Sequence, residues 1–132
     1  MEEKRNEATP QRPEGDRVLD APSMTIDLQH YIKQIRSEEP WSKSDRNAIT
    51  VFKSENMTIV VVALHDKTEM KTHVAQGTIS VQVIEGKIKF ITDQQSVELN
   101  KQQIVTLHAN IPHSVVALEE TIFLLTTARG NK

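Results

Sequence analysis

The chain has 132 residues, of which 26% are charged, with a formal net charge of −2 and no cysteine. This length suits one domain with one hydrophobic core. The small negative charge gives no electrostatic attraction to nucleic acid or to an anionic membrane surface, so we expect neither as a partner. The lack of cysteine excludes disulfides and thiolate metal sites. No apolar run approaches the ~20 residues of a membrane span and the N-terminus is not signal-like, so we expect a cytoplasmic protein.

Residues 1–22 are rich in charge and proline and contain few large apolar side chains. Such a segment buries too little surface to offset the loss of chain entropy on folding. The sequence therefore predicts a disordered N-terminal tail over residues 1–22. A helix and connecting segment over residues 23–46 and a β-barrel over residues 47–132 complete the expected organisation.

Residues 26–37 have the apolar period of an amphipathic helix. The side chains that share its apolar face are Ile26, Leu28, Tyr31, Ile32 and Ile35. Thr25 or Asp27 is suited to cap its start, and Pro40 is expected to end it, because the residue before a proline is pushed out of the helical region. We expect this short helix to cover an open edge or end of the barrel, with Trp41 filling a gap beside it.

Short runs of apolar and β-branched residues follow, separated by turns that hold Asn, Asp or Gly. They predict strands at residues 48–53, 57–65, 78–84, 87–92, 95–99, 103–108, 113–118 and 121–127. Residues 59–64 are apolar without alternation, which is typical of a strand buried on both faces. Eight short strands with one short helix predict an all-β barrel or sandwich.

Two stretches within these strands share one form. Residues 71–90, KTHVAQGTISVQVIEGKIKF, place a histidine before a period-two hairpin, and residues 102–118, QQIVTLHANIPHSVVAL, place His113 between two strands. Both resemble the paired motifs of the cupin family, small β-barrels of the jelly-roll type. The resemblance implies a cupin jelly-roll barrel with one short N-terminal amphipathic helix. It covers roughly residues 47–128.

The first cupin motif reads G-x5-H-x-H-x3,4-E-x6-G. Anchored on Gly86, it places His73 on the second histidine, Lys71 on the first and Ile79 on the glutamate, with a loop one residue longer than the pattern. The second motif reads G-x5-P-x-G-x2-H-x3-N, and His113 matches its histidine. The departures elsewhere are Gln102 and His108 at the first glycine and the proline, Asn110 at the second glycine, and Ala117 at the asparagine.

The resemblance implies a divalent transition metal (Zn, Ni, Fe or Mn) held by three histidines and a glutamate. Only His73 and His113 match ligand positions, so we expect a metal that is weakly held or absent. His65 and His108 are the candidates for additional ligands. The alternative, which we favour, is that these two histidines hydrogen-bond loop backbone.

His73 and His113 are expected to face one cavity, as ligand-binding residues or as a satisfied structural pair. Lys71 lies two residues before His73, so a regular strand would place both on one face, where the lysine would suit a small anionic ligand. A solvated lysine in a turn is the alternative, and the sequence leaves both open. The family's first histidine and glutamate are missing, which favours a binding protein for a small molecule over a metal-dependent cupin enzyme of the oxygenase or isomerase type. Whether the chain is an enzyme stays open. Cupins commonly pair and one helix shields few strand edges, so we expect a homodimer.

Overall fold

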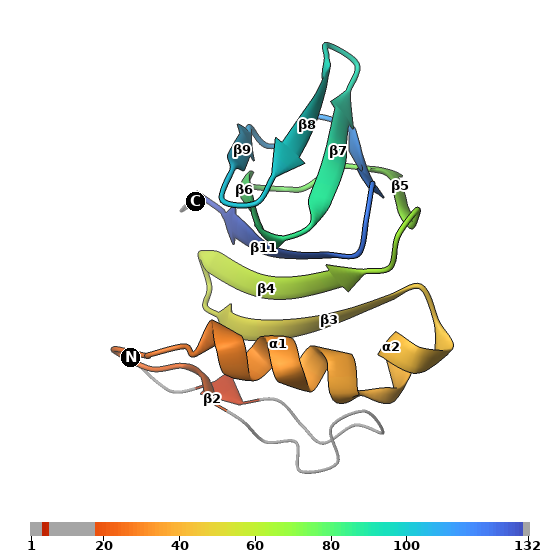
Figure 1. Cartoon of the computed structure of the whole chain (residues 1–132). Coiled ribbons are helices and arrows are strands. Elements are labelled where there is room, and N and C mark those ends of the chain that lie inside the picture. The colour runs from red at the N-terminus through yellow and green to blue at the C-terminus, as the bar shows by residue number, and fades with distance from the viewer. Residues whose placement is uncertain (1–3, 6–17, 131–132) are drawn as a thin grey trace.

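The computed structural model describes residues 4–5 and 18–130 (Figure 1). Two helices lie near the N-terminal end, α1 (Leu28–Ser37) and α2 (Glu39–Lys43). The described strands are β1 (Lys4–Arg5), β2 (Val18–Asp20), β3 (Arg46–Lys53), β4 (Met57–Leu64), β5 (Glu69–His73), β6 (Thr78–Glu85), β7 (Lys87–Thr92), β8 (Ser96–Asn100), β9 (Ile104–Leu107), β10 (His113–Ala117) and β11 (Thr121–Ala128).

Two antiparallel sheets face each other and form the barrel. The strand order is β5-β10-β7-β8 in one and β3-β4-β11-β6-β9 in the other, so strands distant in sequence become neighbours. Period-two alternation turns one side of each strand inward, and the inward apolar side chains make the core. The buried members of this core are Val62, Leu64, Ile79, Val81, Val83, Ile88, Phe90, Leu99, Val115, Ala117 and Phe123.

The helices cover the outer face of the five-stranded sheet (Figure 1). Ile35 of α1 packs there against buried side chains of β3, β4 and β11, so β4 is buried on both faces, as its unbroken apolar run predicted. The Asp27 side chain accepts hydrogen bonds from the backbone N–H groups of Gln29 and His30 and so caps α1. α1 ends at Ser37, as predicted, but Pro40 is not what ends it: Pro40 lies in the first turn of α2, where its missing N–H costs nothing.

The predicted tail needs a correction. Val18–Asp20 forms a strand that pairs with Lys4–Arg5, and Leu19 is buried. Burial of this leucine against the body of the protein supplies the stabilisation that the average composition of the segment does not. The rest of the predicted tail, residues 1–3 and 6–17, lies outside the described residues. Within the described part of the chain, no helix is long and apolar enough to cross a membrane.

The eight predicted strands are all present, with ends within two residues of the predicted ones. β5 was not predicted. Its sequence, EMKTH, has one partly buried side chain and four exposed ones, so it lacks apolar alternation. β5 is the edge strand that carries His73, and its irregularity decides the geometry of the site.

Candidate functional site

His73 and His113 lie side by side on adjacent strands. They are register partners at the end of β5 and the start of β10, and their ring centroids are 4.3 Å apart with the ring planes inclined by 60°. The ring of Phe90 on β7 stacks on that of His113, 5.5 Å away. His113 is buried, whereas His73 is exposed. The structure thus brings together the two histidines that the motifs singled out, one lining the barrel and one at its mouth.

A β-bulge in β5 fixes which side chains accompany this pair. Met70 is the register partner of Val115 and His73 is that of His113, so two residues of β5, Lys71 and Thr72, oppose a single residue of β10. Met70 packs against the core, and the extra residue lets His73 stay on that same side. Lys71 is exposed and lies opposite the outward-facing position between Val115 and His113. The expectation that Lys71 shares the face of His73 assumed a regular strand and was wrong.

Both imidazoles are oriented by the same backbone contact. Nδ1 of His73 lies 2.8 Å from the carbonyl oxygen of Lys71, and Nδ1 of His113 lies 3.0 Å from that of Ile111. A carbonyl oxygen only accepts, so Nδ1 carries the proton in each ring and donates it. In the neutral imidazole this leaves the lone pair on Nε2. Histidines that bind metals through one nitrogen commonly donate the other N–H to a backbone carbonyl in this way.

The remaining family ligands have no counterpart here. Ile79, at the glutamate position, is buried in the core with 3% of its surface exposed. Across the described residues, no group of three or more His, Cys, Asp or Glu side chains is arranged to hold a metal ion. Two imidazole nitrogens fit half the ligand set of a tetrahedral site, and water or a bound small molecule would have to supply the other half.

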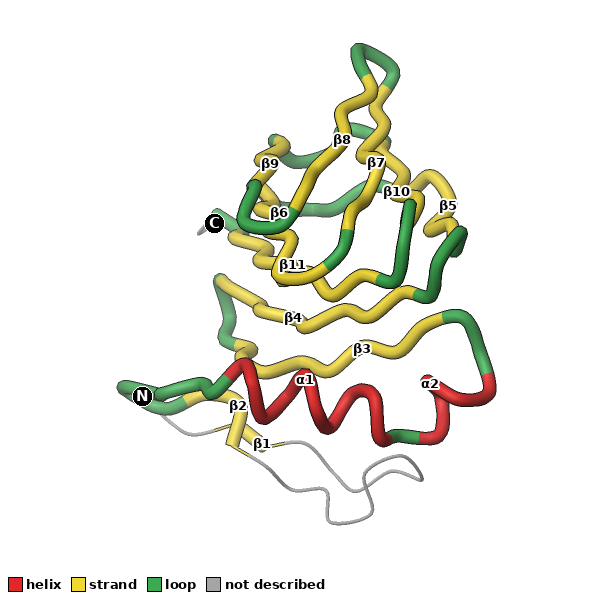
Figure 2. Tube along the Cα trace, viewed as in Figure 1, coloured by secondary structure: helices red, strands yellow, loops and turns green. Residues whose placement is uncertain are grey.

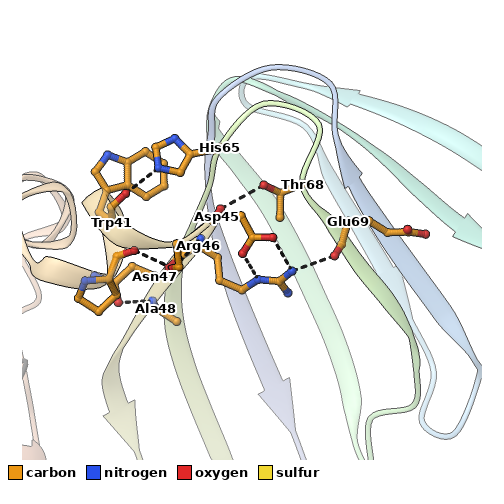
Figure 3. A network of polar contacts seen from close by, with 10 residues as sticks. Trp41, Asp45, Arg46, Asn47, Ala48, His65, Thr68 and Glu69 are labelled. Atoms are coloured by element: carbon orange, nitrogen blue, oxygen red, sulfur yellow. Dashed lines mark hydrogen bonds and ion pairs between the residues drawn. The ribbon is translucent and has the colours of Figure 1, made fainter.

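His65 is used elsewhere. Its ring stacks on the Trp41 indole with centroids 3.5 Å apart, and its Nε2 lies 2.8 Å from the Trp41 carbonyl oxygen, as Figure 3 shows. This agrees with the alternative in which His65 bonds backbone, and it makes Trp41 part of the junction between α2 and the barrel. His108 is exposed in the loop after β9. Among the described residues it joins no metal-binding group with the histidine pair.

A charged pair ties β5 to the same junction (Figure 3). Nε of Arg46 donates to Asp45 at 2.9 Å, and Nη2 donates to the Glu69 carbonyl at the start of β5, also at 2.9 Å. The hydrogen bond from Arg46 lowers the pKa of Asp45, and the same contact raises that of Arg46. The edge strand that carries His73 is thus fixed at its first residue. Sequence reasoning missed this contact because no local pattern relates Arg46 to a backbone carbonyl in another sheet.

No family model and no curated protein matches the sequence. Solved structures do match. A conserved protein of unknown function from Streptococcus pyogenes is 20% identical over 86% of this chain and 94% of its own, with a TM-score of 0.68. A cupin-2 domain containing protein from Shewanella frigidimarina is 13% identical over 80% of this chain and 95% of its own, with a TM-score of 0.64.

A third match is salicylate 1,2-dioxygenase from Pseudoaminobacter salicylatoxidans, 18% identical over 64% of this chain but only 26% of the enzyme, with a TM-score of 0.57. At these identities the likeness concerns the fold and not the activity. The fold prediction is confirmed: two antiparallel sheets closed into a jelly roll, with the motif histidines paired across β5 and β10, make this chain a protein of the cupin fold.

Proposed function

We propose that this chain is a binding protein that holds a small molecule at the barrel mouth through Nε2 of His73 and Nε2 of His113. His73 and His113 would hold a weakly bound divalent transition metal, zinc, nickel, iron or manganese, which would supply an open coordination position for the ligand. The observation that carries the proposal is the matched anchoring of both rings through Nδ1. Anchoring restricts the rings before a ligand arrives, so less side-chain entropy is lost on binding.

The chemistry of the pair defines the ligand. Neutral Nε2 atoms accept hydrogen bonds or bind a metal, and the Phe90 ring beside His113 adds a flat apolar surface. A small anionic ligand would be held by protonated imidazoles or by the metal. Lys71 would not contribute, because the bulge removes it from the face of His73.

Binding is favoured over catalysis by the missing ligands. A metal-dependent cupin enzyme of the oxygenase or isomerase type, using His73 and His113, is the alternative. The buried Ile79 offers no carboxylate to hold and tune a metal. The site therefore suits reversible binding of a ligand that itself completes the coordination.

Metal titration tests the proposal. Purified protein should carry well below one equivalent of metal, and added zinc or nickel should raise Tm only modestly. Stabilisation grows with the logarithm of ligand concentration over Kd, so a weak site gains little, whereas a tight site at ~1,000 times its Kd would add about 4 kcal/mol. His73→Ala and His113→Ala should remove that shift. His30→Ala, a histidine on the exposed face of α1, should keep it. Chelator-resistant metal at one equivalent would overturn the proposal in favour of the enzyme, and shifts that survive both substitutions would place the metal elsewhere.

Nitrogen NMR of the histidine side chains tests the anchoring itself. We expect both His73 and His113 to be protonated on Nδ1 at mildly alkaline pH, although free imidazole side chains favour the other tautomer. Finding the proton on Nε2 in either ring would contradict the hydrogen bonds to Lys71 and Ile111.

The homodimer and the cytoplasmic location stay predictions. β9 is an edge strand of the five-stranded sheet, and the Ile104 side chain on it is exposed. An edge with unpaired backbone groups and an exposed apolar side chain is suited to pairing with a second copy. Light scattering at micromolar concentration should give twice the mass of the chain, and a monomer mass would count against the dimer.

A further inference from the structure

A pocket lies away from the two strands that carry the histidine pair. It has a volume of about 310 Å3 and lies between the segment that follows β2 and the β3–β4 hairpin. Its apolar lining includes Met24 before α1, Phe52 of β3, and Met57 and Ile59 of β4. Figure 2 shows the segment between β2 and α1 running beside this end of the hairpin. The volume falls at the lower end of the roughly 300–1,000 Å3 that is usual for small-molecule sites.

Asp20 gives this apolar pocket a chemical preference. It lines the pocket, only 2% of its surface is exposed, and its Oδ1 atom is buried without a hydrogen-bond partner. A buried carboxylate oxygen without a donor is costly and is rare in native proteins. None of the described residues that line the pocket is basic.

We propose that this pocket binds a small organic cation, a protonated amine on a short apolar body, whose N–H donates to the Asp20 carboxylate. The apolar walls take the body of the ligand, and the ammonium supplies both the donor and the countercharge. Oδ1 is covered by protein, so the contact requires the carboxylate to turn toward the pocket. An anion would be repelled, and a neutral apolar ligand would leave the oxygen without a donor.

The site is independent of the proposed function. The histidine pair lies on β5 and β10 of the four-stranded sheet, whereas the pocket is formed by the five-stranded sheet and the N-terminal segment. The two proposals therefore stand or fall separately.

Three probes of one shape test the preference: benzylamine, benzyl alcohol and benzoate, titrated into the full-length 15N-labelled protein. Amide signals of residues 20–26 and 54–59 should shift with benzylamine. Because a charge-assisted hydrogen bond is roughly twice as strong as a neutral one, benzylamine should bind at least about tenfold more tightly than benzyl alcohol. Benzoate should bind most weakly. Equal affinities for benzylamine and benzyl alcohol, or amide shifts confined to other residues, would overturn the proposal. Both outcomes can be read from the unmodified protein.

Substitutions then assign the preference to one carboxylate. Asp20→Asn keeps the shape and should remove the advantage of benzylamine over benzyl alcohol. Glu55→Gln removes the same charge from an exposed neighbouring position outside the lining and should leave the advantage intact. Met24→Trp should fill the pocket and weaken both probes, which keeps the test valid if the Asp20 variant fails to fold. An equal loss in the Glu55 variant would mean general electrostatics and no site.

Discussion

The substitution Ile35→Ala tests whether the packing of α1 against the sheet contributes to the free energy of unfolding. This residue is 0% exposed and packs with Ile49, Val61 and Ile122 on the outer face of the five-stranded sheet. Ile35→Ala removes three carbons, worth roughly 2.4 kcal/mol at ~0.8 kcal/mol each. The cavity adds to this because strands held by their ladders cannot collapse into it, so we expect a loss of about 3–4 kcal/mol in the free energy of unfolding.

Urea denaturation followed by circular dichroism measures this loss. An unchanged dependence of the free energy of unfolding on urea concentration would show that the folded and unfolded states are as compact as in the parent protein. Tm should fall by about 10 °C, at roughly 3 °C for each kcal/mol in a chain of this size. His30→Ala, on the exposed side of the same helix, is the matched control and should change stability by no more than ~0.5 kcal/mol. A loss below ~1 kcal/mol for Ile35→Ala would refute the reasoning, since it would mean that the helix detaches without disturbing the sheet.

Three further predictions concern turns and charges. Gly86→Ala should destabilise the fold by about 1–3 kcal/mol in the same denaturation assay, because φ is +92° and the new Cβ would clash with the backbone of Glu120 and Thr121. Thr121→Val should lose about 1–3 kcal/mol there, because the fully buried hydroxyl bonds backbone groups that would be left unpaired, and a neutral result would contradict this. Arg46→Gln should raise the pKa of Asp45 toward its ordinary value in a carboxyl NMR titration. The lowered pKa implies a contribution to stability that is present above the unfolded-state pKa and lost as pH falls through the folded-state pKa. The variant should therefore lose this contribution at neutral pH, and the part of the stability difference that is due to Asp45 should vanish in acid. An unchanged Asp45 titration would exclude the contact.

Alternation in the sequence was sufficient to place most strands because each has one face in the core. β4 was recognisable from its unbroken apolar run, since α1 covers the face that would otherwise be polar. β5 was missed for the opposite reason: it is an edge strand with four exposed side chains, and its ladder partner lies some forty residues on.

The site was predictable in part. Motif spacing was enough to single out His73 and His113, which the structure places in ring contact. The position of Lys71 was not predictable, because a bulge adds a residue without leaving a local signature and reverses the faces that follow. Nor could the sequence reveal Asp20 as a buried carboxylate, since that depends on Leu19 anchoring β2 to the body of the protein.

The place of β11 in its sheet has a consequence for how the protein is made. β11 follows every other described strand, yet it lies between β4 and β6 and pairs with both along its length. During synthesis, the β3–β4 hairpin and β6 therefore have no common neighbour until β11 leaves the ribosome. Until then, the backbone groups of β4 and β6 that β11 will pair stay open to water and to other chains. Closure of the sheet, the step with the greatest loss of loop entropy, therefore waits until β11 has been synthesised.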